Sequence, residues 1–132
     1  MLRFEFVVPG RPASVHTDDR AQYQAWKRLV RAHAELAYPA PRPGLRFRLT
    51  IVVLSSGWHI DVDNVIKPVQ DALAGWAYAN DRQVTDVDSH RRSVHEKFQA
   101  KRLPLLLADA WDAGMDCVYV RGEEARSVEV YL

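Results

Sequence analysis

The run RFRLTIVVL, residues 46–54, constrains the fold more than any other segment, because it has the composition and the alternation of a β-strand. Apolar residues occupy every second position from Phe47 to Ile51, and the residues between them are Arg48 and Thr50. One face of the predicted strand therefore begins polar. A strand of this kind needs partners, so the chain is expected to build a β-sheet around it.

Four further segments are rich in β-branched or aromatic residues and are predicted to be strands. They cover residues 3–8, 83–94, 116–122 and 127–132. The last two are close enough in the sequence to pair as a hairpin. Proline- and glycine-rich loops separate the first strand and the strand at 46–54 from the helical segment between them.

Three segments carry apolar residues at helical spacing. They cover residues 21–38, about 64–77, and 103–114. Asp18 or Asp19 can cap the first helix. Pro68 lacks an N–H and fits a helix only in its first turn, so the regular part of the second helix is expected to start at Ile66 or Lys67.

These elements predict one domain over residues 1–132, of α+β class, with a mixed β-sheet and about three helices. Cys117 is the only cysteine, so no internal disulfide can form. No apolar run approaches the roughly 18 residues that a membrane-spanning helix needs. The first residues do not resemble a signal peptide, because Glu5 interrupts a very short apolar stretch. We therefore expect a cytoplasmic protein with no membrane partner.

Charge is unevenly distributed although the net charge is only +1. Residues 1–50 carry nine basic and four acidic residues, whereas residues 51–132 carry nine and thirteen. A metal-dependent enzyme that acts on a polyanion would need such a basic half beside an acidic site, and chance unevenness is the alternative. Candidates for contacts with DNA phosphates are Lys27, Arg28, Arg31, Arg46, Arg48 and Arg82; an ordinary solvated surface is the alternative for them.

Acidic side chains concentrate in the segment HIDVDNVIKPVQDALAGWAYANDRQV, residues 59–84. Asp61 and Asp63 would lie on the same side of an extended segment, where two carboxylates repel each other unless a cation lies between them. Mg²⁺ prefers oxygen ligands and commonly takes one or two carboxylates. Asp81 is a third candidate ligand, which only tertiary folding can bring to the pair. Helix capping with surface charge is the alternative for the two aspartates.

Lys67 shares a helix face with Asp71 at a spacing of four residues. Near a metal site it would stabilise charge on a phosphate, and a solvated surface ion pair is the alternative. A calcium EF-hand is excluded, because the sixth position counted from Asp61 is Ile66 rather than glycine. The five histidines show no paired spacing for zinc.

The segment DVDNVIKPVQDAL…NDRQV resembles the signature of the RusA family of Holliday junction resolvases. The family pattern is Asp-x-Asp-Asn-x-x-Lys, then Asp-Ala-Leu in the same helix, then Asp-x-Gln-Val. VVPGRPASV at the N-terminus is similar to the family's first strand and loop. The positions that match the signature in order are Asp61, Asp63, Asn64, Lys67, Asp71, Asp81, Gln83 and Val84.

The resemblance implies a RusA-like fold and a homodimer that binds four-way DNA junctions and nicks two strands symmetrically. It implies Mg²⁺, which Mn²⁺ can replace, held by Asp61, Asp63 and Asp81, with Lys67 as the catalytic lysine. Some relatives have a basic residue directly before the first aspartate, where this chain has Ile60 with His59 close by. The segment from His95 to Gly122 carries an extra helix relative to the shortest relatives.

Three functions are open at this point. The first is a Mg²⁺-dependent, structure-selective endodeoxyribonuclease, in which a metal-activated water attacks the phosphodiester. The second is a module of the same fold that binds branched DNA without cutting it. The third is a structural or protein-interaction domain, which would show no affinity for DNA even at low salt.

Overall fold

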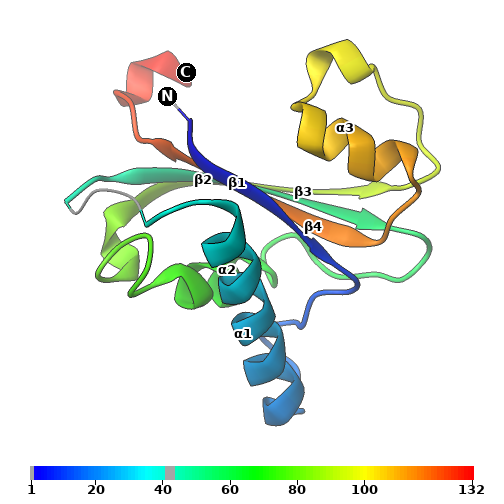
Figure 1. Ribbon diagram of the computed structural model, residues 1–132, viewed down its shortest axis with the longest axis horizontal. Coiled ribbons are helices and arrows are strands. Elements are labelled where there is room, and N and C mark those ends of the chain that lie inside the picture. The colour runs from blue at the N-terminus through cyan, green and yellow to red at the C-terminus, as the bar shows by residue number, and fades with distance from the viewer. Residues whose placement is uncertain (1, 41–43) are drawn as a thin grey trace.

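A computed structural model describes residues 2–40 and 44–132 of the chain. Four strands form one sheet in the order β1-β4-β2-β3, in which β2 and β3 are parallel and the other pairs are antiparallel. Figure 1 shows α1 and α2 on one face of the sheet and α3 on the other. The predicted α+β class, with a mixed sheet and three helices, is confirmed. The strands are β1 (Leu2–Pro9), β2 (Phe47–Ser55), β3 (Val84–Ser93) and β4 (Cys117–Glu124), and the helices are α1 (Arg20–Ala37), α2 (Ile66–Leu73) and α3 (Leu105–Asp112).

The local signals placed most element boundaries correctly. The Asp19 side chain caps α1 by accepting a hydrogen bond from the Gln22 amide at 3.0 Å. Helix α2 begins at Ile66, as the position of Pro68 requires. Its expected end at residue 77 is wrong, because Ala74 is extended and Gly75 adopts a φ of +87°. A positive φ favours glycine and turns the chain out of the helix after Leu73.

The predicted strand at residues 127–132 is also wrong. Residues Val128–Val130 form a short 3₁₀ turn instead. Strand β4 already has β1 on one side and β2 on the other, so it offers no free edge to a hairpin partner. The last residues therefore leave the sheet, and Tyr131 packs its ring under the Arg48 guanidinium, 4.1 Å from the ring centroid.

Two apolar layers cover the two faces of the sheet. Phe47, Leu49 and Ile51 are fully buried on the face that α1 and α2 cover. On the other face, Val52 and Leu54 pack beneath α3, together with Trp111. Helix α3 does not reach the first half of β2, so Arg48 and Thr50 lie only partly buried there, as their alternation predicted. No helix within the described parts of the chain is long and apolar enough to cross a membrane.

Candidate active site

After β2 ends, residues 60–62 of the acidic motif lie alongside β3. The Arg91 guanidinium of β3 donates to the carbonyl of Ile60 at 3.2 Å, and the Ser89 hydroxyl donates to the carbonyl of Val62. On its other side, the Asn64 carbonyl accepts from the amide of Val15, in the loop after β1, at 3.0 Å. The motif is therefore held between β3 and the first loop of the protein.

Asp61 and Asp63 lie on a turn rather than on an extended segment. The Asn64 amide donates to the Asp61 carbonyl at 3.0 Å, and residues 62–65 form consecutive turns that lead into α2. The expected alternation therefore does not apply, and the turn rather than a strand presents both exposed side chains. One oxygen of Asp61 lies 2.8 Å from Nε2 of His59, whose side chain is also exposed.

Lys67 joins the helix to the turn before β3. Its Nζ lies 3.1 Å from Asp71 within α2 and 2.6 Å from Asp81, which begins the 3₁₀ turn Asp81–Gln83. Hydrogen bonds to Asp81 and then to Asp71 raise the pKa of Lys67 to about 12. The same contact with Lys67 lowers the pKa of Asp81. Lys67 is therefore a cation at neutral pH and is not available as a general base.

Tertiary folding brings Asp81 to Lys67, but among the described residues it does not assemble a preformed set of metal ligands. Within residues 2–40 and 44–132, no group of three or more His, Cys, Asp or Glu side chains is placed to hold a metal ion. The donor set still fits Mg²⁺ in kind, because the exposed carboxylates of Asp61 and Asp63 are hard oxygen ligands and Mg²⁺ often uses only one or two of them. Lys67 pairs with Oδ2 of Asp81, so this oxygen could join them only by leaving Lys67.

Gln83 has a structural role that its place in the motif did not reveal. Its side-chain amide donates to the carbonyl of Leu45 at 2.9 Å and accepts from the amide of Ala79 at 2.8 Å. The residue therefore ties the turn before β3 to the start of β2 and fixes the position of Asp81 nearby. Sequence reasoning missed this role and that of Arg91, because the bond of Gln83 to Leu45 and the bond of Arg91 to Ile60 join segments that are far apart in the chain.

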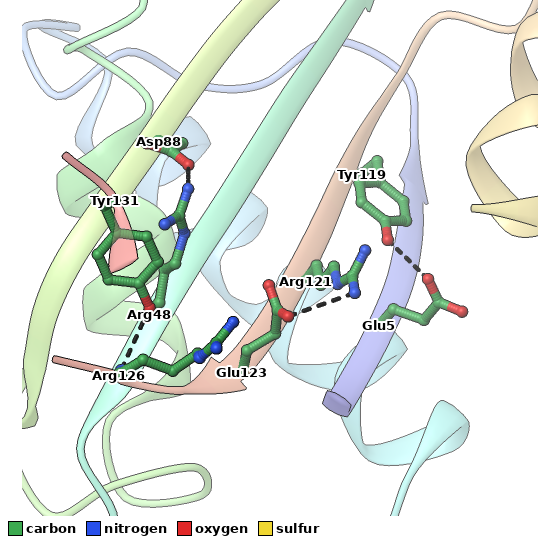
Figure 2. A network of polar contacts seen from close by, with 8 residues as sticks. All are labelled: Glu5, Arg48, Asp88, Tyr119, Arg121, Glu123, Arg126 and Tyr131. Atoms are coloured by element: carbon green, nitrogen blue, oxygen red, sulfur yellow. Dashed lines mark hydrogen bonds and ion pairs between the residues drawn. The ribbon is translucent and has the colours of Figure 1, made fainter. Parts of the chain in front are cut away.

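Two of the six residues predicted to contact DNA, Arg31 and Arg48, form ion pairs within the protein. Figure 2 shows Arg48 paired with Asp88 within a polar network. The pair lies on the sheet face opposite the acidic motif, because Arg48 alternates with Phe47 and Leu49, which are buried on the face that α1 and α2 cover. Arg31 pairs with Glu35 and donates to the carbonyls of Ala72 and Ala74, at 3.3 Å and 3.0 Å. These contacts weigh against phosphate binding by either residue, although that role stays a prediction.

The remaining four candidates are Lys27 and Arg28 on α1, Arg46 before β2, and Arg82 after Asp81. Lys27 packs over the ring of Tyr23 on α1, with Nζ 4.9 Å from the centroid. Three are exposed: Arg28 on α1, Arg46 before β2, and Arg82 directly after Asp81. Their phosphate contacts stay predictions.

The contacts of Arg31 predict a measurable effect on stability. Arg31→Gln removes a charged donor from the carbonyls at the end of α2, so we expect the free energy of unfolding to fall by about 1–2 kcal/mol. Arg28→Gln on the same helix is the matched control and should change it by less than about 0.5 kcal/mol, because Arg28 is exposed. Urea unfolding checks both, and equal effects of the two changes would contradict the structural role of Arg31.

The Lys67–Asp81 contact predicts how Lys67 titrates. NMR of the lysine side chains should give a pKa of about 12 for Lys67, and Asp81→Asn should lower it, because Asp81 is the largest cause of the shift. Asp88→Asn, on the opposite face, is the control and should leave it unchanged. Since the pKa is raised from 10.5, the stabilisation is complete below about pH 10.5 and disappears as pH rises through 12. An unchanged Lys67 titration in Asp81→Asn would contradict the pairing.

Comparison with known proteins gives one match that covers most of the chain. The family model described as endodeoxyribonuclease RusA matches residues 5–102. The matched range includes the acidic motif, Lys67 and Asp81, and it ends before α3 and β4. No curated protein matches the chain.

Proposed function

Because the chain belongs to the RusA family of endodeoxyribonucleases, we propose that it is a Mg²⁺-dependent nuclease that resolves four-way DNA junctions by paired, symmetrical nicks. The observation that supports this most is the position of Lys67. A lysine that is charged at neutral pH contacts Asp81 across 14 residues of sequence, beside the turn that presents Asp61 and Asp63. A surface ion pair alone would not need this second, long-range carboxylate.

The proposed roles follow from the chemistry of each group. Asp61, Asp63 and Asp81 would hold the metal. When bound, Mg²⁺ supplies a water of lowered pKa and neutralises charge on the scissile phosphate. Lys67 keeps its proton on Nζ and directs a positive charge toward the carboxylates, so it would stabilise the negative charge that develops on the phosphate or the leaving oxygen. The acidic residues themselves repel DNA, which makes cations around the site necessary for binding.

Among the six predicted DNA contacts, those cations would come from the three that are exposed, Arg28, Arg46 and Arg82, and from Lys27. We propose that two copies of the chain act as a homodimer, because symmetrical nicks on a junction need two active sites. The protein would act in the cytoplasm, in DNA recombination and repair. Size-exclusion chromatography with light scattering would test the dimer, and a monomer at micromolar concentration would contradict it.

A second candidate function is a module that binds branched DNA without cutting it. Two observations favour it: the described residues contain no assembled group of three metal ligands, and Oδ2 of Asp81 is paired with Lys67. Such a protein would bind a junction equally well with and without metal, and would not cut it.

Cleavage of an end-labelled four-way junction tests the two functions together. A linear duplex of matching sequence runs beside it, with Mg²⁺ and with EDTA. Paired nicks in the junction alone, lost in EDTA, would support the resolvase. A junction that is shifted on a gel but stays intact under both conditions would support the binding module.

A further inference from the structure

We propose that Arg91 is a positioning residue for the metal site, which acts through His59 on the carboxylate of Asp61. This inference rests on the proposed function and adds two residues to it. Arg91 lies on β3, 30 residues beyond Asp61 in the sequence, and the motif signature does not include it. It reaches the motif because β3 is the strand along which residues 60–62 run.

Four contacts connect Arg91 to Asp61. The Arg91 guanidinium contacts Nδ1 of His59 and donates to the backbone carbonyl of Ile60 at 3.2 Å. The other ring nitrogen of His59, Nε2, lies 2.8 Å from Oδ1 of Asp61. The same Arg91 nitrogen also lies 3.2 Å from Nε2, so the guanidinium packs against the imidazole ring rather than on one ring nitrogen. A carboxylate oxygen accepts, so His59 donates from Nε2 to Asp61, and Arg91 holds the ring in the position that allows it.

The contact between His59 and Asp61 is better explained by the orientation of a metal ligand than by stabilisation of the fold. His59 and Asp61 are both exposed, with 66% and 64% of their side chains accessible, so their contact buries little surface. An exposed carboxylate without such a partner would rotate freely. Hydrogen bonds from outside the ligand set orient metal-binding carboxylates, and their loss typically weakens metal binding by 10–100-fold.

His59 and Arg91 also line a cleft that is open to a substrate. A cavity of about 340 Å³ lies at the carboxyl ends of β2 and β3, lined by residues that include Trp58, His59, Arg91 and Arg92. A direct phosphate contact by Arg91 is therefore the rival explanation. The contacts to His59 and to the Ile60 carbonyl favour positioning, because they direct the guanidinium at the motif itself.

Metal binding to the protein alone separates the two explanations. We would measure Mn²⁺ binding without DNA, by the loss of the free-ion EPR signal, and junction binding in EDTA by fluorescence anisotropy. Arg91→Gln should raise the Mn²⁺ Kd about tenfold or more and leave junction affinity within about twofold. Arg102→Gln makes the same charge change at an exposed residue of the 3₁₀ turn Ala100–Arg102, outside this cleft, and should alter neither quantity.

Two further variants keep the test decisive if Arg91→Gln folds poorly. His59→Gln changes an exposed residue and should raise the Mn²⁺ Kd similarly, and the double variant should add little to either single change, because both act on one carboxylate. Arg91→Lys keeps a positive charge without the planar fork, so it should share the metal defect while junction affinity is retained.

The proposal is overturned if the Mn²⁺ Kd of Arg91→Gln or of His59→Gln equals that of the wild type. It is equally overturned if Arg91→Gln weakens junction binding in EDTA while Arg91→Lys restores it, since that pattern identifies a phosphate contact. Failure of the proposed nuclease function would look different: the wild-type protein itself would then show no Mg²⁺-dependent cleavage.

Discussion

Asp63→Asn is expected to reduce junction cleavage at least about 10³-fold, because it removes a carboxylate from the proposed metal site and metal catalysis contributes several kcal/mol to such reactions. Asp63 is exposed on the turn before α2, so the change should leave the fold intact. Junction binding in EDTA should be retained or slightly strengthened, because one negative charge near the DNA is lost. Single-turnover cleavage of the labelled junction at saturating Mg²⁺ measures the effect.

Asp112→Asn is the matched control, since it neutralises an exposed aspartate at the end of α3, on the opposite face of the sheet. It should cut at the wild-type rate. Wild-type cleavage by Asp63→Asn would refute the carboxylate site and with it the proposed mechanism. A loss of cleavage in both variants would indicate a general charge effect instead.

Lys67→Met is expected to reduce the cleavage rate about 10²–10³-fold, the usual cost of removing one group that stabilises charge in the transition state. The concentration of Mg²⁺ that gives half the maximal rate should not rise, because Lys67 competes with the metal for Oδ2 of Asp81 rather than holding the metal. This separates it from Asp63→Asn, which should lose metal binding as well. A full Mg²⁺ titration of single-turnover rates measures both quantities.

Lys101→Met provides the control for the loss of one exposed lysine and should cut normally. Because the pKa of Lys67 is raised to about 12, the wild-type rate should show no loss from lysine deprotonation between pH 7 and 10. If Lys67→Met cut at the wild-type rate, the ion pairs with Asp71 and Asp81 would be structural only.

Much of the fold follows from local sequence. Period-two alternation identified β2 and its polar first half, and helical spacing with an Asp19 cap identified α1. Pro68 placed the start of α2, since a proline is tolerated only in the first turn. Each of these signals acts between residues at most four apart, so the neighbouring residues suffice to determine it. The acidic motif and Lys67 were found in the same way, as a pattern within 24 residues.

Local sequence signals could not predict the order of the strands or the contacts between distant segments. The C-terminal hairpin failed because β4 is an interior strand, which no sequence pattern near residue 127 can reveal. The pairing of Arg48 with Asp88, on the sheet face opposite the motif, joins two strands that are 40 residues apart, so the residues around Arg48 could not predict it. In the same way, only the parallel pairing of β2 with β3 brings Arg91 to His59.

The sequence by itself therefore determined the elements, the faces that they bury and the residues able to do chemistry, because backbone hydrogen bonding and side-chain periodicity are local. Tertiary structure alone decided which of those residues meet. Lys67 reaches Asp81, and Arg91 reaches the motif, through packing of the sheet against α2 and its flanking turns. Such contacts depend on how segments distant in sequence bury their apolar faces together, and that choice is made by the whole core rather than by any one segment.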